Sequence, residues 1–196
     1  PVRAALDSVP ELAGVLAFAP GDGATGAAVI GEVDAVAFTG SVATGKKIAA
    51  ACAARMIPAF LELGGKDPLI ITATADLETA VSAALRGSVL STGQACQSIE
   101  RIYVQRPLYE PFVERLVEEA GRAQLNWPDI AAGEIGPLIF DRQGEIIESH
   151  IADAVAKGAT VRCGGAVEAH GGGHWVRPTV LTGVDHTFYV RTVESF

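Results

Sequence analysis

Residues 34–63, DAVAFTGSVATGKKIAAACAARMIPAFLEL, decide the fold class of this chain. The segment opens with a short apolar run that ends at Phe38, turns through small residues, and continues as an alanine-rich stretch. It then returns to a second apolar run at 58–63. A strand, a helix and a second strand in this order form the β-α-β unit of a parallel sheet. The segment therefore predicts an α/β domain.

The same alternation continues on both sides of this segment. Short apolar runs typical of strands lie at 15–19, 69–72 and 101–105 and near TVRCGG (160–165) and PTVL (178–181). Three helical patterns are also present. One starts at Asp76, and the other two cover 109–123 and 141–157. We therefore expect a doubly wound α/β domain followed by part of a second α/β domain. The two glycines of ELGGK place the boundary between residues 1–62 and 63–196.

Composition excludes several classes of function. The net charge of -8 and the pI near 5.0 argue against binding to nucleic acid or to an anionic membrane surface. No apolar run reaches the eighteen or so residues of a spanning helix, and the first ten residues lack the pattern of a signal peptide, so we expect a cytoplasmic protein. With 49% hydrophobic and only 19% charged residues, the chain should expose apolar surface that another subunit covers, which predicts a homo-oligomer.

Two glycine-rich turns could approach a phosphate group. GDGATG (21–26) matches G-x-G-x-x-G literally, but no acidic residue follows at about twenty positions, so a plain turn into a helix is the alternative. In FTGSVATGKK (38–47), a strand leads through small residues into a helix whose exposed N–H groups favour an anion such as a cofactor diphosphate. The alternative there is ordinary N-capping by Thr39 or Ser41.

Two further segments carry side chains that could react. In STGQACQSIER (91–101), Cys96 stands among small and polar residues, which fits a reactive thiol in a cleft or an indifferent loop cysteine. Glu62, at the end of an apolar strand, could serve as a general base or form a structural ion pair with Lys66.

The remaining cysteines and histidines predict structural roles. Cys52 lies among alanines at helical spacing and is expected in the core, and the three widely spaced cysteines of the chain, Cys163 included, indicate neither disulfides nor a zinc site. His170 and His174 have the spacing of two metal ligands on a helix, but the glycines between them predict a solvated loop instead. We therefore expect no metal site.

Taken together, FTGSVATGKK, LELGGKDPLII, GQACQSIERIYV and the terminal ESF resemble the aldehyde dehydrogenase superfamily in order and spacing. The resemblance runs from about residue 11 to the last residue and implies part of a Rossmann-like domain for NAD or NADP, followed by part of an α/β catalytic domain. Family members are more than twice as long. The family's oxyanion asparagine and its adenine-ribose contacts would lie upstream, and Asn126 does not match that asparagine.

The resemblance also implies roles for individual residues. Cys96 matches the nucleophile that forms a thiohemiacetal and then a thioester, and Glu62 matches the residue that activates the deacylating water. The cofactor contacts that it implies are Gly40, Ser41, Gly45, Gly64, Gln143, Glu194 and Phe196. The implied reaction is oxidation of an aldehyde, with a lean toward aromatic aldehydes. A cofactor-independent thiol esterase and an inactive assembly fragment remain the alternatives.

Overall fold

The structure, a computed structural model, describes residues 2–12, 14–193 and 195. The chain forms two compact units, residues 1–63 and 64–196. This division lies one residue from the boundary that the ELGGK glycines predict. That the units are a cofactor domain and a catalytic domain stays a prediction at this point. Each unit is described by itself.

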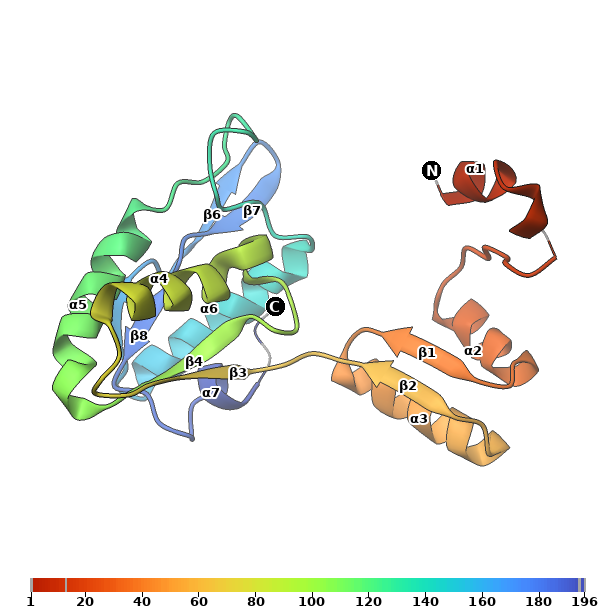
Figure 1. Ribbon diagram of the computed structural model, residues 1–196, viewed down its shortest axis with the longest axis horizontal. Coiled ribbons are helices and arrows are strands. Elements are labelled where there is room, and N and C mark those ends of the chain that lie inside the picture. The colour runs from red at the N-terminus through yellow and green to blue at the C-terminus, as the bar shows by residue number, and fades with distance from the viewer. Residues whose placement is uncertain (1, 13, 194, 196) are drawn as a thin grey trace. The chain divides into compact units, whose positions relative to one another are not determined.

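The first unit is built around one β-α-β motif (Figure 1). Strands β1 (Val36–Thr39) and β2 (Ala59–Glu62) pair in parallel, with Val36 opposite Ala59 and Thr39 opposite Glu62. The connection is α3 (Val42–Arg55), in which Cys52 is 1% exposed, as the alanine-rich spacing predicts. The elements before this motif are α1 (Val2–Asp7), the short 3-10 turn η1 (Pro10–Leu12) and α2 (Gly23–Glu32).

The predicted strand at 15–19 is wrong. These residues adopt neither helix nor strand, and Val15, Leu16 and Phe18 are 79%, 52% and 49% exposed. An isolated apolar run becomes a strand only when a neighbouring strand satisfies its backbone N–H and C=O groups, and no described residue pairs with this run.

GDGATG forms the start of α2, as the plain-turn alternative for this segment proposes. Asp22 caps the helix, because its carboxylate accepts hydrogen bonds from the N–H groups of Ala24 (3.0 Å) and Thr25 (3.2 Å). These backbone donors hold the pKa of Asp22 below its ordinary value. A carboxylate of the chain itself thus occupies the position where an anionic ligand would bind.

The second unit begins with another parallel β-α-β motif. Strand β3 (Asp67–Ile71) pairs with β4 (Ile99–Val104), and α4 (Leu77–Val89) makes the crossover. Asp76 caps α4 by accepting from the Thr79 N–H at 2.9 Å, as the sequence predicts. The 3-10 turn η2 (Leu90–Gly93) and the residues after it lead from α4 to β4.

The rest of the second unit combines helices with two antiparallel strand pairs. The helices are α5 (Arg106–Arg122), α6 (Asp141–Ala156) and α7 (Tyr189–Thr192). The strand pairs are β5 (Thr160–Cys163) with β8 (Val180–Thr182), and β6 (Val167–His170) with β7 (Gly173–Val176).

The prediction of a solvated loop at His170–His174 is wrong, because β6 and β7 form a hairpin there. Gly171 and Gly172 have φ values of 53° and 86° and make its two-residue turn, a backbone that glycine adopts without strain. Gly173 already belongs to β7, opposite His170.

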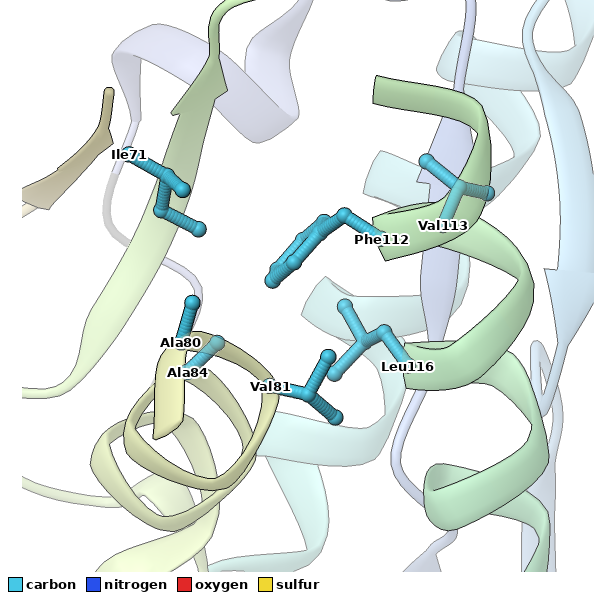
Figure 2. Close-up of a cluster of buried hydrophobic side chains, with 7 residues drawn as sticks. All are labelled: Ile71, Ala80, Val81, Ala84, Phe112, Val113 and Leu116. Atoms are coloured by element: carbon cyan, nitrogen blue, oxygen red, sulfur yellow. The ribbon is translucent and has the colours of Figure 1, made fainter. Parts of the chain in front are cut away.

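The core of the second unit lies between α4, α5 and β3 (Figure 2). Ala80, Val81 and Ala84 present one face of α4, and the side chains of α5 project toward them. Burial of these apolar residues fixes the helices on the sheet that carries β4, and β4 follows the Cys96 loop. The buried cluster consists of Ile71, Ala80, Val81, Ala84, Phe112, Val113 and Leu116. Across the described residues, no helix has both the length and the apolar character needed to cross a membrane.

Candidate active site

Cys96 lies on the loop between η2 and β4, and its side chain is exposed. Its thiol donates a hydrogen bond to Gln97 Oε1 at 3.1 Å. The residue after next, Ser98, is only 3% exposed, and its N–H donates to the Ala95 carbonyl at 2.9 Å. The sulfur is therefore reachable from solvent, while the turn that carries it is anchored just behind.

The backbone that leads to Cys96 has an unusual conformation. Ser91 and Thr92 have φ values of 54° and 62°, and Gly93 follows at 70°. Left-handed backbone is rare for residues other than glycine and is least favourable for a β-branched residue such as threonine. Contacts with a distant segment hold this turn, because Thr92 Oγ1 accepts from the Gly136 N–H at 3.0 Å.

Gln94 adds two more bonds between this loop and the same distant segment. Its side-chain carbonyl accepts from the Ile139 N–H at 2.8 Å, and its amide donates to the Pro137 carbonyl at 3.1 Å. The side chain of Gln94 therefore serves as a bridge rather than as a free polar group beside Cys96.

The ELGGK stretch passes directly against the Cys96 loop. A Cβ atom built on Gly65 would lie 2.1 Å from the Cys96 carbonyl oxygen, so only glycine fits at this position. Its neighbour Gly64, one of the predicted cofactor contacts, is half-buried. Sequence reasoning singled out the pair as a turn and missed this close approach to Cys96.

Glu62 ends β2 in the first unit and is exposed. Its backbone carbonyl accepts from the Gly40 N–H at 3.0 Å. Lys66, the ion-pair partner of Glu62 in the predicted alternative, forms an ion pair with Glu100 within the second unit. The role of Glu62 opposite Cys96 stays a prediction, since the two residues belong to different units.

The predicted diphosphate turn begins α3. Ser41 is the N-cap, and its Oγ accepts from the Thr44 N–H at 3.3 Å. A Cβ atom on Gly45 would lie 2.5 Å from Leu63 Cδ2, so the missing side chain lets α3 pack against the end of its own sheet. On Gly40, a Cβ atom would meet the Phe38 ring at 2.5 Å. The N-cap reading is confirmed for Ser41, and a capped, exposed N-terminus is compatible with an anion in front of it.

Of the three remaining predicted cofactor contacts, Gln143, Glu194 and Phe196, the structure describes only Gln143. Gln143 lies in the first turn of α6 and is half-buried. Glu194 and Phe196 lie outside the described residues. Ser195 between them is described, and its Oγ lies 2.8 Å from Lys66 Nζ and 3.0 Å from His150 Nδ1.

This polar cluster of Lys66, Glu100, His150 and Ser195 was not predicted from sequence. Lys66 and Glu100 form an ion pair in which the side chains are only 11% and 17% exposed. His150 is 7% exposed, and burial, with a further contribution from the Lys66 charge, lowers its pKa; Asp153 opposes this shift. No local signal could reveal the cluster, because Lys66 and Ser195 are 129 residues apart.

A cavity of about 410 Å³ in the second unit lies beside β4 and the polar cluster. Apolar side chains of α5, including Phe112 and Leu116, form part of its wall, together with Lys66 and Ser195. Thr92 and Gln94 also line the cavity, whereas Cys96 is not among its lining residues. The cavity and the thiol are therefore separate features of this unit.

The two histidines of the hairpin have separate partners. His170 Nε2 lies 3.2 Å from Glu168 Oε2, while His174 Nδ1 lies 3.0 Å from Asp141 Oδ1. Among the residues that the structure describes, no three potential ligands group around a metal position.

Comparison with known proteins decides the family. The family model described as "Aldehyde dehydrogenase family" matches residues 4–196. The chain belongs to the aldehyde dehydrogenase family. A betaine aldehyde dehydrogenase of Mesorhizobium japonicum is 39% identical over 181 residues, which are 90% of this chain and 37% of that protein.

Solved structures of aldehyde dehydrogenases agree with this assignment. A protein assigned as the aldehyde dehydrogenase PutA of Anabaena variabilis is 54% identical with a TM-score of 0.95, over 98% of this chain and 41% of that one. The NAD+ complex of an aldehyde dehydrogenase from Bacillus cereus is 39% identical with a TM-score of 0.85, over 91% and 37%. The chain thus spans about two fifths of its relatives, and the predicted α/β fold with a partial Rossmann-like domain is confirmed.

Proposed function

We propose that this chain belongs to an enzyme that oxidises an aldehyde to the carboxylic acid with NAD+ or NADP+. The observation that carries the proposal is the exposed Cys96 thiol on a loop that Thr92 and Gln94 hold and that Gly65 approaches closely, in a chain that matches the family over nearly its whole length. A fixed, accessible sulfur among polar neighbours is suited to nucleophilic attack.

The residues of the chain supply a covalent route. After its proton has passed to solvent, the Cys96 sulfur attacks the carbonyl carbon and forms a C–S bond. A backbone N–H of the Cys96 loop stabilises the oxyanion. The donor is not the Ser98 N–H, because that group already donates to the Ala95 carbonyl. The bound nicotinamide would supply the acceptor for the hydride that leaves the same carbon.

Glu62 then completes the cycle in this proposal. Its carboxylate takes a proton from a water molecule, and the water oxygen attacks the thioester carbon. The C–S bond breaks, and the carboxylic acid leaves while the sulfur returns to its starting state. Glu62 is exposed at the end of β2, where the chain turns through Gly64 and Gly65, so the carboxylate is accessible to water.

The cofactor-binding residues of the proposal fit a diphosphate. α3 has fourteen residues and an N-terminus capped by Ser41, with exposed residues in its first turn. Gly40 and Gly45 occupy positions where a Cβ atom would collide with the side chains of Phe38 and Leu63, so glycine at both positions lets the turn pack closely. Gly64, Gln143, Glu194 and Phe196 are proposed as the further contacts. The Bacillus cereus relative, solved with NAD+, supports NAD+ as the first cofactor to test.

The test is NADH or NADPH formation by the complete protein. A panel of an aromatic aldehyde, betaine aldehyde and a short aliphatic aldehyde would compare two substrate classes: the aromatic aldehydes that the resemblance favours, and betaine aldehyde, for which the Mesorhizobium relative is named. Cys96→Ala should abolish the reaction, while Cys52→Ala and Cys163→Ala should leave most of it. Equal losses in all three variants, or ester cleavage without any cofactor dependence, would refute the proposal.

Assembly and location complete the proposal. We infer a homo-oligomer, supported by large apolar side chains that are exposed in this chain, such as Phe60 at 64%, Ile70 at 71% and Ile130 at 80%. A cytoplasmic location fits the three free cysteines. Sedimentation of the complete protein as a monomer at micromolar concentration would contradict the oligomer.

A further inference from the structure

The turn that carries Cys96 is fixed firmly at its far end. The Ser98 N–H donates to the Ala95 carbonyl at 2.9 Å, so residues 95–98 form a closed four-residue turn. Ser98 is 3% exposed and leads directly into β4. The direction of the turn therefore depends on what holds its near end, where the chain enters from Gln94.

The backbone that enters the turn does not hold its shape alone. Ser91 and Thr92 have left-handed φ values of 54° and 62°. Such values in residues other than glycine persist only where the surrounding structure imposes them. Contacts made by side chains of this loop must therefore supply the constraint, and Gln94 makes two of them.

The partner of Gln94 is residues 136–139, which we call the anchor strip. The strip follows Ile135, which is 2% exposed. In its middle, the Leu138 N–H donates to the His174 carbonyl of β7 at 2.7 Å. The strip is thus attached to the hairpin and to the buried Ile135, and it offers the Cys96 loop a fixed support.

The amide of Gln94 matches this support with both of its ends. Its Oε1 accepts from the Ile139 N–H at 2.8 Å, and its Nε2 donates to the Pro137 carbonyl at 3.1 Å. Because an N–H can only donate and a carbonyl can only accept, a single orientation of the amide satisfies both partners. The bond from the Gly136 N–H to Thr92 Oγ1 runs beside this pair and acts in the same sense.

The exposure of Cys96 makes the path of its backbone decisive. An exposed side chain has few packed neighbours to direct it, so the position of its sulfur follows the position of its Cα atom. Only Ala95 stands between Gln94 and Cys96 in the sequence, so the Cα atoms of Gln94 and Cys96 are at most about 7 Å apart. A shift of Gln94 is therefore transmitted to the sulfur with little loss.

We propose that Gln94 is a positioning residue for the Cys96 nucleophile, because its amide clamps the near end of the turn to the anchor strip. This inference rests on the proposed function and deepens it. Gln94 acts through Ala95 and the backbone of the turn, and it is not required to touch the aldehyde or the cofactor. Its loss should lower the rate of the chemical step and leave cofactor binding in place.

The first experiment compares Gln94→Met with the wild type in the complete protein. Methionine has a similar length but neither the donor nor the acceptor of the amide. The value of kcat for aldehyde oxidation should fall about tenfold or more, since a displacement of about 1 Å at a reacting group costs roughly a hundredfold. The dissociation constant for NAD+ or NADP+, measured by calorimetry, should stay close to the wild-type value.

Hydrogen exchange of two neighbouring amides gives a readout that does not depend on catalysis. The Ile139 N–H donates to Gln94, so its exchange should accelerate in Gln94→Met. The Leu138 N–H donates to the His174 carbonyl and should keep its wild-type rate. General damage to the fold would accelerate both amides alike.

Gln94→Glu supplies a variant whose defect should respond to pH. A carboxylate accepts from the Ile139 N–H but has no donor for the Pro137 carbonyl, whereas a protonated carboxyl has one. Because only the neutral form donates, this carboxyl should protonate above its ordinary pKa of about 4.3. The ratio of variant to wild-type kcat should therefore rise as the pH falls from about 8 to about 5, while Gln94→Met shows no such rise.

Two comparisons keep the pH experiment specific. Taking the ratio to the wild type cancels the ionisation of Cys96 and of the Asp141–His174 pair beyond the anchor strip, which both proteins share. Gln124→Glu is the matched control, because Gln124 is exposed and its side chain donates to the Arg122 carbonyl two residues away. This control should keep wild-type kcat across the same pH range.

The outcomes separate this inference from the proposed function. With an active wild type, unchanged kcat in Gln94→Met would overturn the positioning role alone. A Gln94→Glu variant that is as impaired at pH 5 as at pH 8 would also overturn it, and so would equal acceleration of the Ile139 and Leu138 amides. A wild type that oxidises no aldehyde with NAD+ or NADP+ would overturn the proposed function and this role with it.

Discussion

Gly65→Ala should impair catalysis through the position of Cys96, although Gly65 carries no reactive group. A Cβ atom at Gly65 would lie 2.1 Å from the Cys96 carbonyl oxygen and 3.2 Å from its carbonyl carbon. Real Cβ contacts are essentially never shorter than 3.0 Å, so the oxygen must retreat by about 0.9 Å, the difference between 3.0 and 2.1 Å. Because the close neighbour is backbone, the Cys96 loop or the ELGGK stretch must move as a whole.

A displacement of this size has a known consequence for catalysis. A misplacement of about 1 Å at a reacting group costs roughly a hundredfold in rate. We therefore expect kcat/KM for aldehyde oxidation to fall by about two orders of magnitude, together with a slower alkylation of Cys96. Cofactor affinity, measured separately, should change much less than kcat/KM.

Gly121→Ala is the matched control, because Gly121 lies within α5 and a Cβ atom there meets nothing within 4 Å. Alanine in an open helical position stabilises by about 0.4–1 kcal/mol. Wild-type kcat/KM in Gly65→Ala, or an equal loss in Gly121→Ala, would refute the argument that Gly65 makes room for the Cys96 carbonyl.

Three further predictions concern the base, the core and the buried histidine. Glu62→Gln should give a stoichiometric burst of reduced cofactor followed by a slow phase in stopped-flow absorbance, because deacylation loses its base, and equal slowing of both phases would contradict this role. Phe112→Ala should lower the free energy of unfolding by about 3–5 kcal/mol in urea titrations, since the ring is 2% exposed at the centre of the α4–α5 core, and a change below 1 kcal/mol would contradict that packing. His150 has a pKa below its ordinary value of 6.5, so its contribution to stability is complete above pH 6.5 and is lost as the pH falls through the lower folded-state pKa. His150→Gln should flatten the pH dependence of the urea midpoint in this window, and a wild type whose midpoint does not fall there would show that the histidine is not shielded.

The fold was predictable where its signals are local. The β-α-β segment at 34–63 carries its own strand, helix and strand pattern, and Asp76 and Ser41 cap helices with their own side chains. The strand expected at 15–19 failed because a strand depends on a partner that no local pattern supplies. The hairpin around Gly171 and Gly172 was predictable in principle, since two glycines between runs of strand-forming residues are a hairpin signal.

The sequence named candidate residues for the site, whose roles stay predictions, but not the contacts that surround them. Residue type and neighbours singled out Cys96, and the order of the motifs singled out Glu62. The close approach of Gly65 to the Cys96 carbonyl joins positions 31 residues apart, and the bond between Lys66 and Ser195 joins positions 129 residues apart. Contacts of this kind arise from packing of the whole unit, which a single sequence does not encode in any local pattern.

The left-handed turn before Cys96 sets two selective pressures against each other. Thr92 adopts a backbone conformation that threonine disfavours, yet its hydroxyl holds the Gly136 N–H. A directed-evolution library scored for thermal tolerance alone should drift toward glycine or asparagine at this position, because either relaxes the backbone. A library scored for turnover should keep threonine, because the tie to Gly136 maintains the loop. Position 92 would then report, by its amino acid alone, which of the two pressures a lineage had experienced.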